Sequence, residues 1–234
     1  MHLRLYLPGR AVGAVVVGDR VAVLASGGID SAVLVAQLAG EGREVTPIYV
    51  RFGLAWEDVE ARHLQQFLTS LPPPDIRPLV VLDLPVADVY GAHWSVTGQD
   101  APDGHSSDEA VYLPGRNLLL LAKSSVWCAL NGITTIALGT LAANPFPDAD
   151  GEFFTGYSTL AGRALGHRVD VVTPFAGLAK HEVLEIGRPF ALNLTFSCIA
   201  PRSERHCGLC NKCAERRLAF QALGMADTTE YATQ

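Results

Sequence analysis

The stretch VAVLASGGIDS at residues 21–31 decides the fold of this chain. It is an apolar run of strand length that breaks at Ser-Gly-Gly and then opens a helix-like segment at 31–38. A strand that feeds a turn and a helix N-terminus directs unpaired backbone N–H groups at one point, where the helix dipole favours an anion. Gly27 and Gly28 let the backbone approach a phosphate without an intervening Cβ. The stretch therefore predicts a phosphate-binding loop.

Three polar side chains add to this loop. Ser26 and Ser31 supply hydroxyl donors, whereas the Asp30 carboxylate would repel a phosphate unless a cation lies between them. We therefore expect a nucleotide bound together with Mg2+. The spacing fits neither the P-loop of NTPases nor the dinucleotide fingerprint G-x-G-x-x-G. It resembles the pyrophosphate loop (PP-loop) of ATP pyrophosphatases, which cleave ATP between its α and β phosphates and adenylate a substrate. The alternative is an ordinary strand-to-helix turn with an N-cap.

Composition limits the class of protein. The 234 residues are 49% hydrophobic and 18% charged, which is typical of a well-buried α/β protein and excludes a disordered chain. We expect one domain, 1–234. The formal net charge of -6 argues against a surface built to bind nucleic acid, so the expected partners are small molecules. No segment approaches the roughly 18 apolar residues of a membrane span, and residues 1–4 lack a signal-peptide pattern. We therefore expect a cytoplasmic protein with no membrane partner.

Apolar runs of strand length alternate with helix-period segments along most of the chain. The expected strands are 21–25, 45–50, 77–84, 133–138 and 169–172, and the expected helices are 31–39, 57–68, 118–130, 153–165 and 180–186. Strands separated by helices indicate parallel βαβ units. The predicted fold is therefore α/β, with a doubly wound, mostly parallel, Rossmann-like sheet.

Two regions do not follow this alternation. Residues 1–20 form an N-terminal extension, which we expect to be a short hairpin or an irregular lead-in to the first core strand. Residues 85–110 are polar and rich in glycine. An irregular stretch of this length in a compact domain is usually functional or mobile, so it is either a lid or a passive excursion.

The cysteines indicate a metal site. Four of the five cysteines lie close together in the C-terminal segment 195–220: Cys198, Cys207, Cys210 and Cys213. Four thiolates without a vacancy are typical of structural zinc, whereas an iron–sulfur cluster and redox disulfides are the alternatives. We expect this zinc-binding segment to shape the C-terminal part, at a distance from the nucleotide. Cys128 lies alone in an apolar segment and is expected to be a small core residue.

Several polar residues are expected at one edge of the sheet. Ligands of open α/β sheets bind beyond the carboxyl ends of the strands. The acidic loop 144–152, which follows the expected fourth strand, should therefore share a crevice with the loop after residue 25. Arg116 and Asn117 stand at the entry of the expected helix 118–130, behind Pro-Gly, and should face the same crevice.

The phosphate loop and the cysteine cluster, in this order, resemble the QueC (ExsB) family of 7-cyano-7-deazaguanine synthases, whose fold is of the adenine nucleotide alpha hydrolase-like kind. The matching segments are 24–31, 113–117, 146–148 with 152–153, 178–182, and the four cysteines with the serine before the first. The resemblance implies an ATP-dependent ligase that converts 7-carboxy-7-deazaguanine and ammonia into 7-cyano-7-deazaguanine, a precursor of queuosine, through an adenylated acid and an adenylated amide. It implies ATP, Mg2+ and Zn2+ as cofactors.

The resemblance also implies roles for individual residues. The ATP-binding set is Ser26, Gly27, Gly28, Asp30 and Ser31; the catalytic set is Asp30, Lys180 and Arg116; and the substrate set is Asn117, Asp148 and Glu152. Each role has a structural alternative: a solvated lysine for Lys180, an ion pair for Arg116, and turn or N-cap positions for Asp148 and Glu152.

Two segments, 49–57 and 140–149, depart from the family's pattern, and both are expected to border the substrate. The substrate could therefore be a different carboxylate, handled by a related adenylating ligase. A PP-loop enzyme that modifies tRNA and a nucleotide-binding module without turnover are further alternatives. Free ammonia is the expected nitrogen source, because no glutaminase-like Cys/His module is evident. A homodimer is possible.

Overall fold

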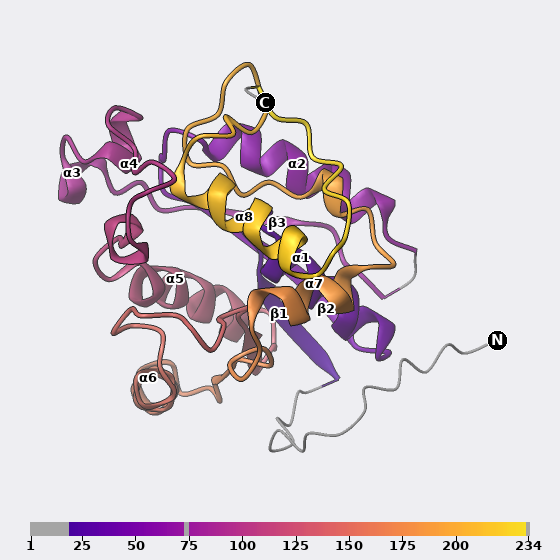
Figure 1. Cartoon of the computed structure of the whole chain (residues 1–234). Helices are drawn as coiled ribbons and strands as arrows, with labels where there is room; N and C mark the ends of the chain where they lie inside the picture. Colours follow the sequence, from indigo (N-terminus) through magenta and orange to yellow (C-terminus); the bar gives the residue numbers. More distant parts are fainter. Residues whose placement is uncertain (1–18, 73–74, 233–234) are drawn as a thin grey trace.

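The computed structural model describes residues 19–72 and 75–232 (Figure 1). Of the lead-in expected over residues 1–20, residues 1–18 lie outside the described part of the chain. The first strand begins at Arg20. The strands are β1 (Arg20–Leu24), β2 (Glu44–Arg51), β3 (Val80–Asp83), β4 (Thr135–Ala137) and β5 (Asp170–Val172). The longer helices are α1 (Ile29–Gly40), α2 (Glu57–Ser70), α5 (Arg116–Leu130), α6 (Gly151–Leu165), α7 (Lys180–Gly187) and α8 (Asn211–Ala222).

The five strands form one parallel sheet in the order β3-β2-β1-β4-β5. The doubly wound α/β sheet predicted from the sequence is confirmed. The chain runs outward from β1 to β3 and then returns to place β4 on the other side of β1. The loops after β1 and β4 therefore leave the sheet in opposite directions, which opens a crevice at this switch point.

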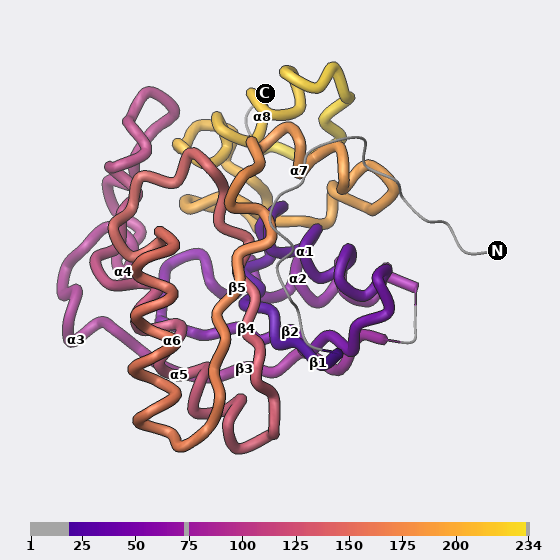
Figure 2. Tube along the Cα trace, turned by 90° about the horizontal axis from the view of Figure 1, so that it is seen from below, coloured from indigo at the N-terminus to yellow at the C-terminus, as the bar shows by residue number. Residues whose placement is uncertain are grey.

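Different helices cover the two faces of the sheet (Figures 1 and 2). Side chains alternate along a strand, so β1 contributes to both cores. Val21 and Val23 pack with α1, α2 and α7, whereas Ala22 and Leu24 belong to the cluster that contains Leu121 of α5 and Phe154 of α6. All four of these β1 residues are buried, which explains the uninterrupted apolar run in the sequence.

The irregular stretch 85–110 is attached to the cysteine segment. It contains two short helices, α3 (Ala87–Tyr90) and α4 (Trp94–Thr97). The Gly104 N–H donates to the carbonyl of Leu209, and the Asn211 N–H donates to the carbonyl of Pro102. Residues 102–104 therefore pack beside the start of α8, the C-terminal helix that the sequence pattern did not predict.

Within the described residues, no helix combines the length and the apolar character needed to cross a bilayer.

Helix α7 crosses α1 so closely that a side chain is excluded at Gly187. A Cβ at Gly187 would lie 2.7 Å from Val33 Cγ2 and 3.1 Å from Leu192 Cδ2. This contact fixes the C-terminal end of α7, the helix that begins at Lys180, against α1.

We expect Gly187→Ala to lower the free energy of unfolding by about 1–3 kcal/mol, because overpacking displaces these helices. Urea unfolding monitored by circular dichroism measures the change. The matched control is Gly156→Ala on the exposed side of α6, where no atom lies within 4 Å of the position that the new Cβ would take. That control should be neutral or stabilising by up to about 1 kcal/mol, since alanine favours helix. Equal effects of the two substitutions would contradict the close crossing.

Candidate active site

A cavity of about 440 Å³ opens at the carboxyl ends of β1, β2 and β4. It is lined by the phosphate loop after β1, by the N-termini of α5 and α7, and by the first turn of α8. A second chamber of about 210 Å³ adjoins it and lies between the phosphate loop and the cysteine segment. The two chambers share Ser26, Asp30, Arg116 and Lys180, so the sequence positions predicted for ATP and catalysis are brought together.

The loop after β1 has the geometry of an anion site. The Ser26 N–H donates to Ser31 Oγ over 3.1 Å, and the two hydroxyl oxygens lie 3.3 Å apart. Gly28 is the N-cap of α1 and has no side chain to occupy the first N–H groups of the helix. These N–H groups are therefore free to receive a phosphate.

Gly27 is required where it stands. Its φ is +78°, and a Cβ there would lie 3.0 Å from the carbonyl oxygen of Glu60 in α2. Any other residue would be strained and would press on α2.

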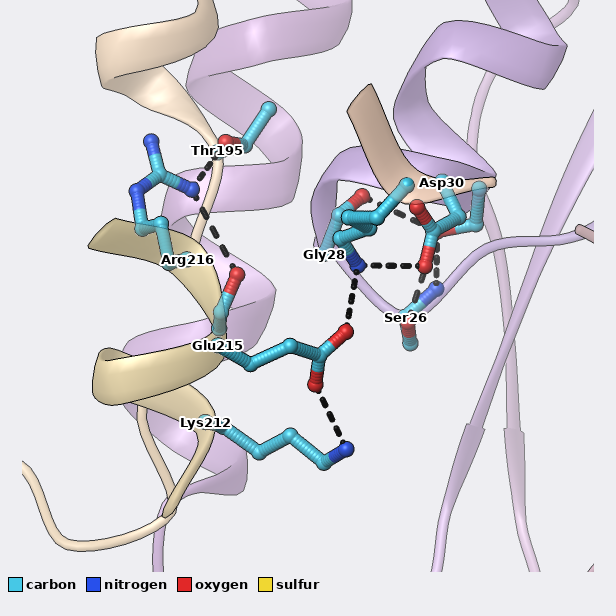
Figure 3. Close-up of polar contacts among 10 residues, drawn as sticks. Ser26, Gly28, Asp30, Thr195, Lys212, Glu215 and Arg216 are labelled. Atoms are coloured by element: carbon cyan, nitrogen blue, oxygen red, sulfur yellow. Dashed lines mark hydrogen bonds and ion pairs between the residues drawn. The ribbon is translucent and has the colours of Figure 1, made fainter. Parts of the chain in front are cut away.

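Lys180 and Asp30 form an ion pair across the cavity. The Lys180 Nζ atom lies 2.7 Å from Asp30 Oδ2 and 3.2 Å from Glu215 Oε1, and Lys212 Nζ lies 2.7 Å from Glu215 Oε2. Figure 3 shows Lys212 and Glu215 pointing from α8 towards the loop that carries Ser26 and Asp30. Burial lowers the pKa of Lys180, but the two carboxylates more than offset this and raise it above its ordinary value, so the lysine stays charged.

Asp30 retains one oxygen for a cation. Its Oδ1 atom is buried and has no hydrogen-bond partner among the described residues, whereas Oδ2 faces Lys180. Burial raises the pKa of Asp30, and Lys180 opposes that effect. An unsatisfied carboxylate oxygen beside a phosphate site fits a hard divalent cation such as Mg2+, which prefers oxygen ligands.

Glu60 and Arg116 face each other beside the phosphate loop. The Tyr49 hydroxyl donates to Glu60 Oε2 over 2.8 Å. Burial raises the pKa of the Glu60 carboxyl to about 7, although Arg116 and the hydrogen bond from Tyr49 lower it. Arg116 is the first residue of α5, and its Nε atom is buried with no hydrogen-bond partner within the described residues. The guanidinium therefore has a free donor for an anionic ligand.

Two of the three residues predicted for the substrate, Asn117 and Asp148, lie together in the cavity, and the third lies elsewhere. Asp148 lines the cavity, but its carboxylate accepts the Asn117 N–H over 2.8 Å, and the Asn117 amide donates to the Asp148 carbonyl over 2.9 Å. This pair secures the start of α5. Glu152 is exposed in the first turn of α6, where Asp150 is the N-cap, and lines an outer groove instead of the cavity. The structure therefore does not bring Glu152 to the site.

The four predicted metal ligands converge. The sulfur atoms of Cys198, Cys207, Cys210 and Cys213 all lie within 4.8 Å of one another. Two of the separations are 3.9 Å, between Cys207 and Cys213, and 3.8 Å, between Cys198 and Cys210. A tetrahedron with Zn–S bonds of about 2.3 Å has edges of about 3.8 Å, so the cluster has the dimensions of a zinc site.

The cysteine site is not remote from the nucleotide loop, contrary to the sequence-based expectation. Cys213 lies in the first turn of α8, between the two residues, Lys212 and Glu215, that the start of this helix carries into the cavity. Arg216 lines the second chamber and not the first, and is only 1% exposed. It donates to Thr195, Thr229 and the carbonyl of Leu192, each over 2.8 Å, which anchors α8.

Sequence analysis missed Glu60, Lys212 and Glu215. Glu60 lies on the same helical stripe as the buried residues Leu64 and Phe67, and a carboxylate on an apolar stripe is the signal that could have identified it. No comparable signal identifies Lys212 and Glu215, because their position depends on where α8 packs.

A loop with the geometry of an anion site after a central parallel strand, faced by Arg116 and Lys180 at the starts of α5 and α7, is the arrangement of a nucleotide-binding α/β protein. The family model described as "Queuosine biosynthesis protein QueC" matches residues 20–224. The chain belongs to this family.

Individual relatives agree. The 7-cyano-7-deazaguanine synthase of Koribacter versatilis is 31% identical over 230 residues, which are 92% of this chain and 94% of that protein. The synthase of Sulfolobus acidocaldarius is 29% identical over 91% of this chain, which spans about half, 48%, of that relative's length. A solved structure of a predicted tRNA methyltransferase subunit from Methanocaldococcus jannaschii covers 72% of this chain, and this chain covers 74% of it, with 17% identity and a TM-score of 0.46. Family membership therefore rests on the sequence matches.

Glu60 also makes stability depend on pH. Its carboxyl ionises near 4.5 in the unfolded chain but keeps its proton up to about 7 in the folded one. This contribution to stability is present at low pH and is lost as the pH rises through 7. Glu60→Gln has no such loss, so the variant should gain about 3 kcal/mol in free energy of unfolding relative to wild type between about pH 4 and about pH 8.

Urea unfolding curves of both proteins at the two pH values measure this gain. Asp58→Asn, on the exposed side of the same helix, is the matched control and should show little gain. A difference between Glu60→Gln and wild type that does not change with pH would show that Glu60 is ionised throughout.

Proposed function

We propose that this chain is an ATP-dependent ligase that converts 7-carboxy-7-deazaguanine and ammonia into 7-cyano-7-deazaguanine. The observation that carries the proposal is that one cavity of a QueC-family chain joins the phosphate loop, the Asp30–Lys180 ion pair and Arg116. The relative from Koribacter versatilis, named for this reaction, is matched over almost its whole length, which supports the activity for a chain of this size.

The first step is adenylation. A carboxylate oxygen of the substrate attacks the α-phosphorus of ATP, the bond to the β-phosphate breaks, and pyrophosphate leaves with the electron pair. The N–H groups of 26–31 bind the phosphates, and Lys180 and Arg116 stabilise the negative charge that grows on the leaving pyrophosphate. Mg2+, held by Asp30 when bound, would neutralise further phosphate charge.

Two further steps produce the nitrile. Ammonia attacks the acyl carbon of the adenylate, AMP leaves, and an amide remains. A second ATP adenylates the amide oxygen, and loss of AMP together with the amide protons forms the carbon–nitrogen triple bond. Hydroxide is a poor leaving group, whereas AMP is a good one. Each of the two adenylations uses one ATP, so two ATP molecules are consumed.

We propose Zn2+ as the metal of the cysteine cluster and assign it a structural role. The sulfur separations support this metal, and the four thiolates leave no position open for a substrate. Ligand thiolates persist in a reducing compartment, so we retain the cytoplasm as the proposed location. That the chain forms a single domain stays a prediction. That it forms a homodimer also stays a prediction, which light scattering would test.

A related ligase for a different carboxylate is the second candidate. The two segments that depart from the family's pattern line the cavity with apolar side chains, among them Phe52, Leu54 and Phe146. The Phe146 ring stacks on Tyr112, with 5.0 Å between ring centroids. These rings favour a flat substrate but specify no base edge.

The experiment that tests the proposal is incubation of the purified chain with ATP, ammonium and 7-carboxy-7-deazaguanine. Mass spectrometry should detect the nitrile together with about two AMP per nitrile, and Lys180→Met should lower the rate by at least about 10²-fold, because charge stabilisation of this kind contributes that much. ATP turnover with other carboxylates, and none with this one, would favour the second candidate. ATP binding without turnover would reject both.

Removal of zinc should weaken nucleotide binding as well as stability, because Cys213 and the cavity residues Lys212 and Glu215 share one helical turn. We expect Cys213→Ser to lose the metal and to bind ATP about tenfold more weakly, equivalent to about 1.4 kcal/mol. Elemental analysis and calorimetric titration with ATP measure the two effects. Cys128→Ala, a buried thiol of α5 outside the cluster, is the control that keeps both. Unchanged ATP affinity in the zinc-free variant would refute the coupling.

A further inference from the structure

Glu60 is a buried carboxyl group with no structural role that explains it. It lines both chambers and is only 9% exposed. Within the described residues it takes part in no ion pair closer than 4 Å, and its hydrogen-bond donors are the side chains of Tyr49 and Trp56. Burying a carboxyl group without an ion-pair partner is unfavourable, so its retention at this position points to a chemical function.

The group lies beside the phosphate loop. A Cβ on Gly27 would lie 3.2 Å from Cγ of Glu60, which places the side chain directly against the turn that receives the phosphates. The adenylated substrate must have its acyl carbon one oxygen away from the α-phosphorus. Glu60 therefore lies in the wall of the two chambers that an acyl-adenylate bound at this loop would occupy.

The other carboxyls of the two chambers have different tasks. Asp30 and Glu215 are ion-paired with Lys180, and Asp148 caps α5 through Asn117. Glu57 accepts the backbone N–H groups of residues 52 and 53, the second over 2.9 Å. Asp108 is exposed at the rim. Among the described residues that line these chambers, Glu60 is therefore the buried carboxyl group that remains available to exchange a proton.

The surroundings of Glu60 allow such an exchange. Arg116 approaches from α5, Tyr49 from β2 and Glu57 from its own helix, while the phosphate loop presents backbone. Across the second chamber lie Lys180, Lys212, Glu215 and Arg216. Burial is the largest effect and raises the pKa of Glu60 to about 7, so both protonation states are populated at neutral pH.

We propose that Glu60 accepts the proton that ammonium gives up when it becomes the nucleophile of the amide-forming step. Ammonium and the Glu60 carboxylate become ammonia and the carboxylic acid; the nitrogen lone pair then attacks the acyl carbon, and AMP leaves with the electron pair of the acyl–oxygen bond. The second proton lost by the nitrogen passes to solvent. The inference rests on the proposed function and names the group that activates the amine.

Hydroxylamine separates this role from adenylation. It is mostly uncharged near neutral pH and needs no proton acceptor to become a nucleophile, so it converts the acyl-adenylate into a hydroxamate. Near pH 7, Glu60→Gln should lower the rate of amide formation from ammonium by about 10²-fold or more. Hydroxamate formation in the same variant should fall by less than about tenfold, since the adenylate still forms. Asp58→Asn, on the same helix, should leave both rates at the wild-type level.

The pH profile gives an independent readout. In wild type, kcat/KM for total ammonium should rise with pH up to about 7 and then level off as Glu60 becomes fully ionised. In Glu60→Gln, it should continue to rise about tenfold per pH unit, because only free ammonia reacts. Tyr49→Phe removes a donor that stabilises the ionised carboxylate, so it should move the wild-type midpoint to higher pH.

Two results would overturn the inference. One is an equal loss of amide and hydroxamate in Glu60→Gln while wild type forms both. The other is a pH profile that is the same in wild type, Glu60→Gln and Tyr49→Phe. If wild type itself forms no hydroxamate from 7-carboxy-7-deazaguanine, the proposed function fails first, and the inference fails with it.

Discussion

The N-terminus of α1 is held against its neighbours at distances that exclude a side chain. On one side, a Cβ at Gly27 would meet the backbone of α2 at 3.0 Å; on the other, a Cβ at Gly139, just after β4, would lie 3.0 Å from the backbone carbon of Asp30. These two contacts fix the direction in which the first N–H groups of α1 point. Since a dipole acts on an anion only over a short range, the proposed phosphate site depends on a backbone that is fixed there.

The C-terminal helix connects the metal site with this loop. The start of this helix carries Cys213 of the four-cysteine cluster together with Lys212 and Glu215, and the buried guanidinium of Arg216 ties its middle to residues 192–195. A metal bound by the four cysteines would thus set the position of charges that reach Lys180. A metal site that only stabilised the C-terminal part of the fold would not affect the position of these charged side chains.

The carboxyl groups of the cavity illustrate how environment divides one functional group into several roles. Asp30 pairs with a lysine and keeps one oxygen free, Asp148 caps a helix, and Glu60 is buried where proton exchange is possible near neutral pH. Identical chemistry in the sequence therefore does not imply identical function. The neighbouring charges and the degree of burial decide each role.

Local signals in the sequence determined the strand–turn–helix at 21–31, the alternation that makes a parallel sheet, and the four-cysteine cluster. Each of these depends on neighbours in sequence or on a short spacing. The separate roles of Lys180 and Asp30, which are 150 residues apart, were implied by the family resemblance, whereas their ion pair is shown only by the tertiary structure. Only the tertiary structure decided that α8 enters the cavity, that Glu60 is buried beside the phosphate loop and that Glu152 faces outward. These outcomes depend on how whole helices pack on the sheet, and packing over long sequence separations leaves little trace in local periodicity.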